Sequence, residues 1–280
     1  MDVVRTVPEL RKAVAAARTA GRRTGFVPTM GCLHEGHLAL IRRAKERCEW
    51  VAVSIFVNPT QFGPGEDFGR YPRTLEEDLA GCRAAGASLV FAPGPEDFYP
   101  AGASTWVEET AVSQGLCGEF RPGHFRGVAT VVAMLFNATQ PDVAVFGRKD
   151  LQQLAVIRRM VRDLHMPVEI VAHETVREPD GLAMSSRNRY LSDEDRIRAR
   201  AVPEALAAAR AAVAAGETAA DRVREAALDR LAREPAFRTQ YCVVADAASL
   251  RPVERVTSGR TVIAVAGHLG ATRLIDNCDL

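Results

Sequence analysis

The sequence predicts an α/β fold, in which a parallel sheet covered by helices on both faces is followed by a smaller α+β domain. Over the first 175 residues, short apolar segments alternate with amphipathic ones, and helices are the usual crossover connections between parallel strands. Trp50–Val57, with the sequence WVAVSIFV, is apolar on both faces, as a central strand of a parallel sheet is. After Val176 the composition changes and becomes rich in Ala and Arg, so we expect two domains, residues 1–175 and 176–280.

In the first domain, helices and strands are expected to alternate. Pro8 lies in the first turn of the first helix and Gly21 ends it. Helices are expected at Pro8–Ala20, His37–Cys48, Thr74–Ala85, Gly127–Thr139 and Asp150–Leu164. Strands are expected at Thr24–Pro28, Trp50–Val57, Ser88–Ala92, Val143–Phe146 and Val168–Ala172. In sheets of this kind ligands bind outside the carboxyl ends of the strands, so the loops that follow strands are the candidate sites.

The second domain is expected to contain helices followed by strands. Ser192–Ala215 is rich in Ala and predicts one long helix, and Asp221–Glu234 predicts another. Short strands are expected at Tyr241–Ala245, Thr261–Ala266 and Ala271–Asp276.

The charge balance favours a small-molecule partner. The chain has 280 residues, with 36 basic and 35 acidic side chains and a formal charge of +1. Proteins that bind nucleic acid usually carry a basic surplus, because phosphate contacts dominate their affinity. No apolar stretch approaches the roughly 20 residues of a membrane span, and charged residues at the N-terminus exclude a signal peptide. We therefore expect a cytoplasmic protein that binds neither nucleic acid nor membranes.

Six cysteines are scattered along the chain without CxxC or CxxH spacing. Their even number would allow disulfides. So few cysteines in so long a chain nevertheless favour free thiols in a reducing compartment, and they assemble no zinc ribbon.

The segment PTMGCLHEGH, Pro28–His37, connects an expected strand to an expected helix. If the helix begins near Glu35 or Gly36, His34 and His37 lie on the same side of it. The N–H groups and dipole of a helix N-terminus suit phosphate, and two imidazoles there can donate to phosphate oxygens. Two histidines beside an ordinary turn are the alternative, which the HxGH pattern at a strand-to-helix turn disfavours.

Two further segments carry groups that bind phosphate. FGRKD, Phe146–Asp150, ends an expected strand, and its Lys149 offers a compact cation, although such a lysine is often a solvated surface residue. GLAMSSRN, Gly181–Asn188, offers two hydroxyls and a guanidinium, although a domain linker explains it about equally well.

A long loop follows the most apolar strand. In FVNPTQFGPGEDFGRYPRT, Phe56–Thr74, the amides of Asn58 and Gln61 suit a small polar substrate. Gln153, one turn into the helix after FGRKD, is a candidate for the same crevice. His124 in RPGHFRGV is interpreted as structural. No GxxxxGK[ST] segment is present, so the expected chemistry is attack of a substrate oxygen on the α-phosphate of a nucleotide outside a Walker-type cradle.

These segments, together with IDN near the C-terminus, resemble the pantothenate synthetase (pantoate–β-alanine ligase) family along nearly the whole chain. HxGH alone also occurs across nucleotidyltransferases and class I aminoacyl-tRNA synthetases, whereas the longer segments in this order are far more specific. The resemblance implies a Rossmann-like first domain, a smaller second domain that closes over the site, and a homodimer. It also implies ligase activity in two steps: ATP and pantoate give pantoyl adenylate and pyrophosphate, and β-alanine then displaces AMP to form pantothenate.

The resemblance also implies roles for residues. His34, His37 and Lys149 would be catalytic, with His37 as proton donor and Lys149 neutralising the α-phosphate. Gln61, Gln153 and Asn58 would hold pantoate, with Gln61 also near β-alanine. Mg²⁺ would bridge the phosphates, with Asp78 or Glu77 near it. The ATP site would be lined by Met30, Gly31, Cys32, Leu33, His34, Glu35, Gly36, His37, Gly147, Arg148, Lys149, Asp150, Val176, Met184, Ser185, Ser186 and Arg187.

Cys32, Thr60 and Arg148 depart from the family pattern, since a small residue, Met and an acidic residue are expected there. None of the three has an assigned catalytic role. The competing hypotheses are another nucleotidyltransferase, an aminoacyl-tRNA synthetase, and an ATP sensor that binds the nucleotide without consuming it.

Overall fold

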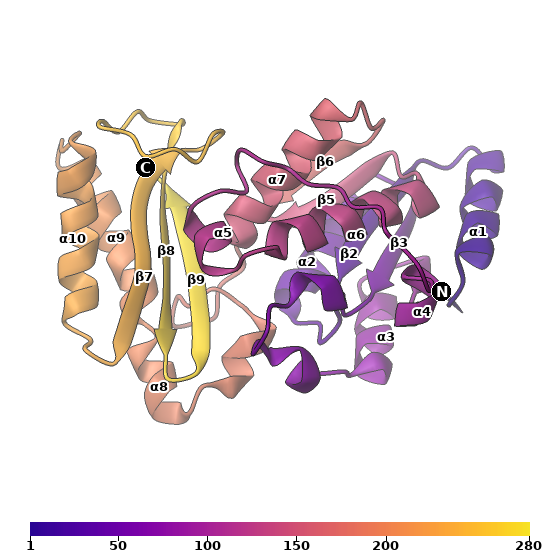
Figure 1. Ribbon diagram of the computed structural model, residues 1–280, viewed down its shortest axis with the longest axis horizontal. Coiled ribbons are helices and arrows are strands. Elements are labelled where there is room, and N and C mark those ends of the chain that lie inside the picture. The colour runs from indigo at the N-terminus through magenta and orange to yellow at the C-terminus, as the bar shows by residue number, and fades with distance from the viewer. The chain divides into compact units, whose positions relative to one another are not determined.

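The computed structural model describes all 280 residues, and the chain divides into two compact units (Figure 1). One unit consists of residues 1–148 and 156–174, and the other of residues 149–155 and 175–280. Residues 149–155, which the sequence assigned to the first domain, therefore group with the second unit. The predicted closing of the second domain over the site stays a prediction.

The first unit is built on a six-stranded sheet in which every pair is parallel, as predicted. The strand order is β1-β4-β3-β2-β5-β6. The strands are β1 (Asp2–Val4), β2 (Thr24–Thr29), β3 (Trp50–Ile55), β4 (Leu89–Phe91), β5 (Val143–Gly147) and β6 (Glu169–His173). Sequence patterns missed β1, because this three-residue edge strand is too short to show periodicity.

Helices pack on both faces of this sheet. Side chains alternate along β2, so Val27 packs against Ile41 and Ala44 of one helix. Phe26 makes an edge contact with Phe136 of another, with ring centroids 6.5 Å apart. The helices of this unit are α1 (Val7–Thr19), α2 (Glu35–Lys45), α3 (Leu75–Ala84), α4 (Pro95–Phe98), α5 (Leu116–Phe120) and α6 (His124–Thr139). A further helix, α7 (Leu151–Asp163), begins in the other unit and ends in this one. The predicted fold class is confirmed, and among these helices the short α4 and α5 were not expected.

The second unit has an antiparallel sheet in the order β7-β8-β9, with two helices against one face (Figure 1). Its strands are β7 (Phe237–Asp246), β8 (Thr261–Leu269) and β9 (Thr272–Asp279). Its helices are α8 (Asp193–Arg198), α9 (Ala201–Ala214) and α10 (Ala220–Ala232). Buried residues of α9, α10 and β8, such as Ala205, Val223 and Ile263, form its core.

The helix predicted over Ser192–Ala215 is wrong, because the structure has two helices with a break at Ala199–Arg200. Pro203 is the physical reason. Proline has no N–H and its ring clashes with the carbonyl four residues earlier, so it is tolerated only in the first turn of a helix. α9 begins at Ala201 and places Pro203 in that first turn.

All six cysteines are free thiols, and five of them are buried. No helix of the structure has both the length and the apolar character that a membrane crossing requires.

Candidate active site

The strand order reverses between β2 and β5, which lie side by side at the middle of the sheet. From β2 the chain builds outward through β3 to β4, and it then returns to place β5 on the other side of β2. Ligands of open parallel sheets bind at such a switch point, outside the carboxyl ends of the strands. PTMGCLHEGH follows β2 there, and Gly147 and Arg148 end and follow β5.

The loop after β2 turns through two left-handed residues, Gly31 with φ +78° and Cys32 with φ +50°. Its start is anchored by Thr29, whose hydroxyl donates to the carbonyl of Ser54 at 2.7 Å and accepts from Gly31 N at 3.2 Å. Left-handed backbone suits Gly and Asn best, which explains why a cysteine is unexpected at position 32. Helix α2 then begins at Glu35, two residues before the start predicted at His37 and at the point that places His34 and His37 on the same side.

His34 and His37 lie together at the start of α2, with ring centroids 4.1 Å apart. His34 caps the helix, since its Nδ1 accepts from Gly36 N at 3.1 Å. His37 Nδ1 accepts from His34 N at 3.4 Å. A ring nitrogen that accepts carries no proton, so in each neutral imidazole the proton is on Nε2. Both rings therefore offer Nε2–H donors beside the helix N-terminus.

Asp78 braces the same loop from α3. It is 2% exposed, and its carboxylate oxygens accept from Cys32 N at 2.9 Å and from Leu33 N at 2.7 Å. The hydroxyl of Thr74 also donates to Asp78, at 3.3 Å. Burial and the Asp78 charge together raise the pKa of the Cys82 thiol to about 12.

These contacts do not fit the predicted metal-ligand role of Asp78. Both carboxylate oxygens are committed to backbone donors, and the structure has no group of three or more His, Cys, Asp or Glu side chains that could hold a metal ion. The neighbouring Glu77 is exposed. The metal-ligand role of Asp78 stays a prediction.

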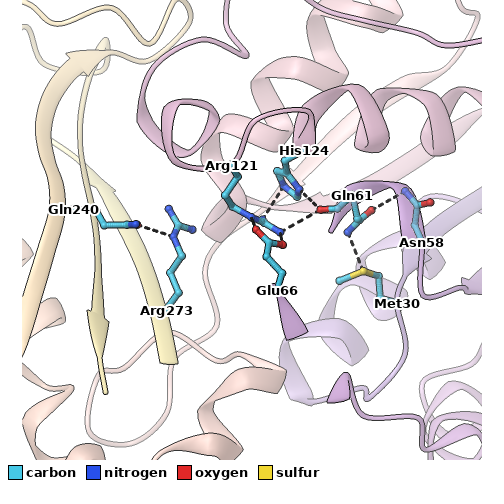
Figure 2. Close-up of polar contacts among 8 residues, drawn as sticks. All are labelled: Met30, Asn58, Gln61, Glu66, Arg121, His124, Gln240 and Arg273. Carbon is cyan, nitrogen blue, oxygen red and sulfur yellow. Dashed lines mark hydrogen bonds and ion pairs between the residues drawn. The ribbon is translucent and has the colours of Figure 1, made fainter. Parts of the chain in front are cut away.

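Asn58 and Gln61 form a chain of amides after β3 (Figure 2). Asn58 Oδ1 accepts from the backbone N–H of Thr60 at 3.3 Å and from the hydroxyl of Tyr99 at 2.9 Å. Asn58 Nδ2 donates to the carbonyl of Gly127 at 3.2 Å and to Gln61 Oε1 at 3.1 Å. A backbone N–H only donates and a carbonyl only accepts, so these partners determine the orientation of both amides.

The amide nitrogen of Gln61 is consequently its outward donor. Gln61 Nε2 donates to Met30 Sδ at 2.9 Å, within the loop that carries the two histidines (Figure 2). A thioether sulfur is a weak acceptor, so a carboxylate or hydroxyl oxygen of a substrate is a stronger partner for the same N–H. The structure therefore brings the predicted substrate residue into contact with the predicted phosphate loop.

Arg148, the unexpected cation of FGRKD, forms an ion pair with Glu174 at 2.9 Å. Both residues belong to the first unit. The positive charge of Arg148, which departs from the family pattern, is therefore paired with the carboxylate of Glu174.

Lys149, Asp150 and Gln153, which were all predicted as site residues, belong to the second unit. The Lys149 side chain is 20% exposed, and its Nζ lies 4.0 Å from Asp150 Oδ1. Asn277 of β9 donates from Nδ2 to the main-chain carbonyl of Lys149 at 3.0 Å. The IDN segment is thus hydrogen-bonded to the backbone of Lys149, a predicted catalytic residue.

The other predicted ATP residues of this unit lie in a segment that folds back on itself, with an antiparallel bridge between Arg177 and Ala183. Met184 N donates to the carbonyl of Val176 at 3.0 Å, which closes the segment between them. Ser185 then caps a 3-10 helix over Ser186–Tyr190, because its hydroxyl accepts from Arg187 N at 3.3 Å. The structure therefore brings Val176 and Met184 together.

Sequence reasoning missed the side chains that brace these segments. In the second unit, Arg177 binds the carboxylate of Asp276 through two hydrogen bonds of 2.6 and 3.0 Å, and it also donates to the carbonyl of Gly181 at 3.0 Å. The hydrogen bonds with Asp276 raise the pKa of Arg177. IDN marked Asp276 as part of a motif, and only the fold reveals its partner, because the two residues are 99 positions apart.

A family model for pantoate-beta-alanine ligase matches residues 2–279 of the chain. Pantothenate synthetase 1 of Bradyrhizobium diazoefficiens is 54% identical over 277 residues, which cover 99% of this chain and 97% of that relative. Pantothenate synthetase of Moorella thermoacetica is 51% identical over 277 residues, which cover 99% of this chain and 98% of that relative.

Solved structures agree with these matches. A pantothenate synthetase from Thermus thermophilus superposes with a TM-score of 0.95 at 48% identity, covering 100% of this chain and 99% of that one. A pantoate-beta-alanine ligase from Francisella tularensis, solved as a complex with beta-gamma ATP and beta-alanine, superposes with a TM-score of 0.81 at 30% identity and covers 100% of this chain and 97% of that one. With a family model and relatives of about half identity matching nearly every residue, the resemblance found in the sequence is confirmed: this chain belongs to the pantoate–β-alanine ligase family and is a ligase.

Proposed function

We propose that the chain joins pantoate to β-alanine at the expense of ATP, through a pantoyl-adenylate intermediate. One observation carries the proposal: Gln61, oriented to donate to a substrate oxygen, contacts Met30 in the loop whose two histidines offer N–H groups for phosphate. A carboxylic acid and the α-phosphate of a nucleotide must meet for adenylation, and this contact puts their predicted binding groups side by side.

In the first step a carboxylate oxygen of pantoate attacks the α-phosphorus of ATP, and pyrophosphate leaves. His34 and His37 donate Nε2–H groups to phosphate oxygens, and the N-terminus of α2 adds its positive dipole. Lys149 supplies a cation for the charge that develops on the α-phosphate. The donors are preorganised, because backbone N–H groups hold the opposite nitrogen of each imidazole.

In the second step the uncharged amine of β-alanine attacks the acyl carbon of the adenylate, AMP leaves, and the nitrogen loses a proton. Gln61 holds the pantoyl group while this happens, and Gln153 is proposed to contact the same group. The remaining nucleotide contacts are assigned as the resemblance implies, to residues 30–37, 147–150, 176 and 184–187. Mg²⁺ enters as part of the substrate, bound to the phosphates of ATP.

We propose that the enzyme is a cytoplasmic homodimer, as the family resemblance implies. Sedimentation equilibrium of the purified chain tests the dimer, and fractionation of the source cells tests the location. A monomer at micromolar concentration would contradict the first proposal.

The decisive experiment measures pyrophosphate released from ATP and Mg²⁺ in the presence of pantoate, with and without β-alanine. We expect continuous turnover with β-alanine and at most one equivalent of pyrophosphate per site without it. His37→Ala and Lys149→Ala should each lower turnover by about 10²-fold or more. Lys12→Ala, which removes an exposed lysine from α1, is the control. ATP binding without any pyrophosphate release would instead indicate a sensor.

A further inference from the structure

The segment RPGHFRG, Arg121–Gly127, has no role in the chemistry proposed above, yet it contacts the substrate residue Gln61 directly. Its Arg121 and His124 converge on the Gln61 backbone (Figure 2). The sequence by itself indicates a structural role for His124 and none for Arg121.

The main-chain carbonyl of Gln61 accepts two hydrogen bonds from this segment. Arg121 Nη2 donates to it at 3.2 Å, and His124 Nδ1 lies 2.8 Å from it. Gln61 is only 8% exposed, so losing these donors would leave a carbonyl with little access to water.

Arg121 and His124 also hold each other. Arg121 Nη1 lies 3.1 Å from His124 Nε2, and because a guanidinium only donates, Nε2 is the acceptor. The proton of the neutral ring is therefore on Nδ1, which donates to the Gln61 carbonyl. Glu66 holds the guanidinium from the other side, at 2.7 Å from Nε and 2.6 Å from Nη2. The Arg121 and Glu66 side chains are 14% and 25% exposed.

Helix α6, which begins at His124 within this segment, packs tightly against the same loop. A Cβ on Gly127 would lie 2.3 Å from the carbonyl oxygen of Thr60 and 2.8 Å from Gln61 N, so only glycine fits there. The carbonyl of Gly127 in turn accepts from Asn58, the residue that orients the Gln61 amide. Gln61 is thus held through its backbone by one set of contacts and through its side chain by another.

We infer that Arg121 and His124, with Glu66 as the anchor of Arg121, are positioning residues that hold Gln61 where its amide N–H meets the substrate acid. The inference rests on the proposed function, since that function makes Gln61 a substrate ligand. It assigns these residues an effect on binding of the acid, because Arg121 and His124 hold the backbone of Gln61, the proposed ligand of the acid. None of them belongs to the segments proposed to bind the nucleotide.

The test is the KM for pantoate and the KM for ATP, measured by pyrophosphate release in the presence of β-alanine. We expect Arg121→Ala to raise the KM for pantoate by about tenfold or more, as the loss of hydrogen bonds from a charged donor does. The KM for ATP should change by no more than about twofold. Arg126→Ala is the matched control, because Arg126 belongs to the same segment and its guanidinium stacks on the Trp106 ring, 5.0 Å from the ring centroid. It should leave both KM values within about twofold of wild type.

Two further variants keep the test decisive if Arg121→Ala fails to fold. Arg121→Lys keeps the charge but cannot bridge Glu66 and the Gln61 carbonyl with one planar group, so it should give an intermediate KM for pantoate. His124→Ala should also raise that KM selectively. Equal changes in both KM values, or an unchanged KM for pantoate in the folded variants, would overturn the inference. A folded wild-type protein without activity would overturn the proposed function itself and the inference with it.

Discussion

Replacing Asp78 by Ala should destabilise the loop that carries His34 and His37. The change removes the acceptors of two backbone N–H groups, those of Cys32 at 2.9 Å and Leu33 at 2.7 Å. A buried donor that loses its acceptor costs about 1–3 kcal/mol, and water reaches the partly buried Leu33 N–H more easily than that of Cys32. We therefore expect the free energy of unfolding to fall by about 2–4 kcal/mol, which lowers the Tm by roughly 4–16 °C.

The same change should weaken ATP binding, because the brace holds backbone that is unfavourable by itself. Cys32 has φ +50°, a left-handed conformation that costs an L-residue roughly 1–2 kcal/mol. Without Asp78 this loop relaxes, and the imidazoles must be brought back into place when the nucleotide binds. The KM for ATP should rise by about tenfold, while Asp78→Asn, which keeps one acceptor oxygen, should lie between wild type and Asp78→Ala.

Thermal denaturation and the KM for ATP at several Mg²⁺ concentrations decide between the brace and a metal ligand. Glu76→Ala, which removes an exposed carboxylate from the first turn of α3, is the control. A metal ligand would show an unchanged Tm and a raised Mg²⁺ requirement in Asp78→Asn. If Asp78→Ala matches Glu76→Ala in both Tm and the KM for ATP, Asp78 does not brace the loop.

Other contacts lead to further predictions. Gly127→Ala should lower the free energy of unfolding by about 1–3 kcal/mol or more and raise the KM for pantoate, because its Cβ would overlap the backbone of the Gln61 loop. Thermal denaturation and kinetics measure the two effects. Gly69→Ala is the control and should show neither effect, because a Cβ there meets nothing within 4 Å. Burial raises the pKa of Glu66, but the hydrogen bonds and charge of its paired arginine outweigh this and hold it below its ordinary value of 4.5. Its stabilising contribution is therefore complete above that value and lost as the pH falls through the lower folded pKa. The free-energy difference between wild type and Glu66→Gln, from urea unfolding, should be constant near neutral pH and shrink below about pH 4.5; a constant difference down to about pH 2.5 would contradict this. Asn277→Ala removes the donor to the Lys149 carbonyl. It should lower turnover by about tenfold and leave the KM for pantoate unchanged. Turnover equal to that of the wild type would show that the contact does not position the lysine.

Much of the fold was predictable, because its main elements carry strong local patterns. The central strands β2, β3 and β5 are short, continuous apolar segments, and α2 has an amphipathic pattern followed by basic residues in its last turn. The helix predicted over Ser192–Ala215 was wrong because the prediction rested on the Ala-rich composition. Pro203 already indicated that a helix has to begin shortly before it. The edge strand β1 and the short helices α4 and α5 have too few residues to show a period.

The predicted active-site segments follow the strands from which they were expected to project. His34 and His37 were paired correctly, because their spacing at a helix start is a local property. Asp78 was noticed for a different role, since a carboxylate in a sequence does not reveal whether it will bind a metal ion or backbone N–H groups.

The sequence by itself determined the fold class and the family, and it predicted the residues of the chemistry, because apolar periodicity and short motifs depend on neighbouring residues. Only the tertiary structure decided how those residues are held. Asp78 lies 46 positions from Cys32, Arg121 lies 60 positions from Gln61, and Asp276 lies 99 positions from Arg177. Such pairs leave no local pattern, since each partner is an ordinary polar residue until the chain folds and burial makes its hydrogen bonds obligatory.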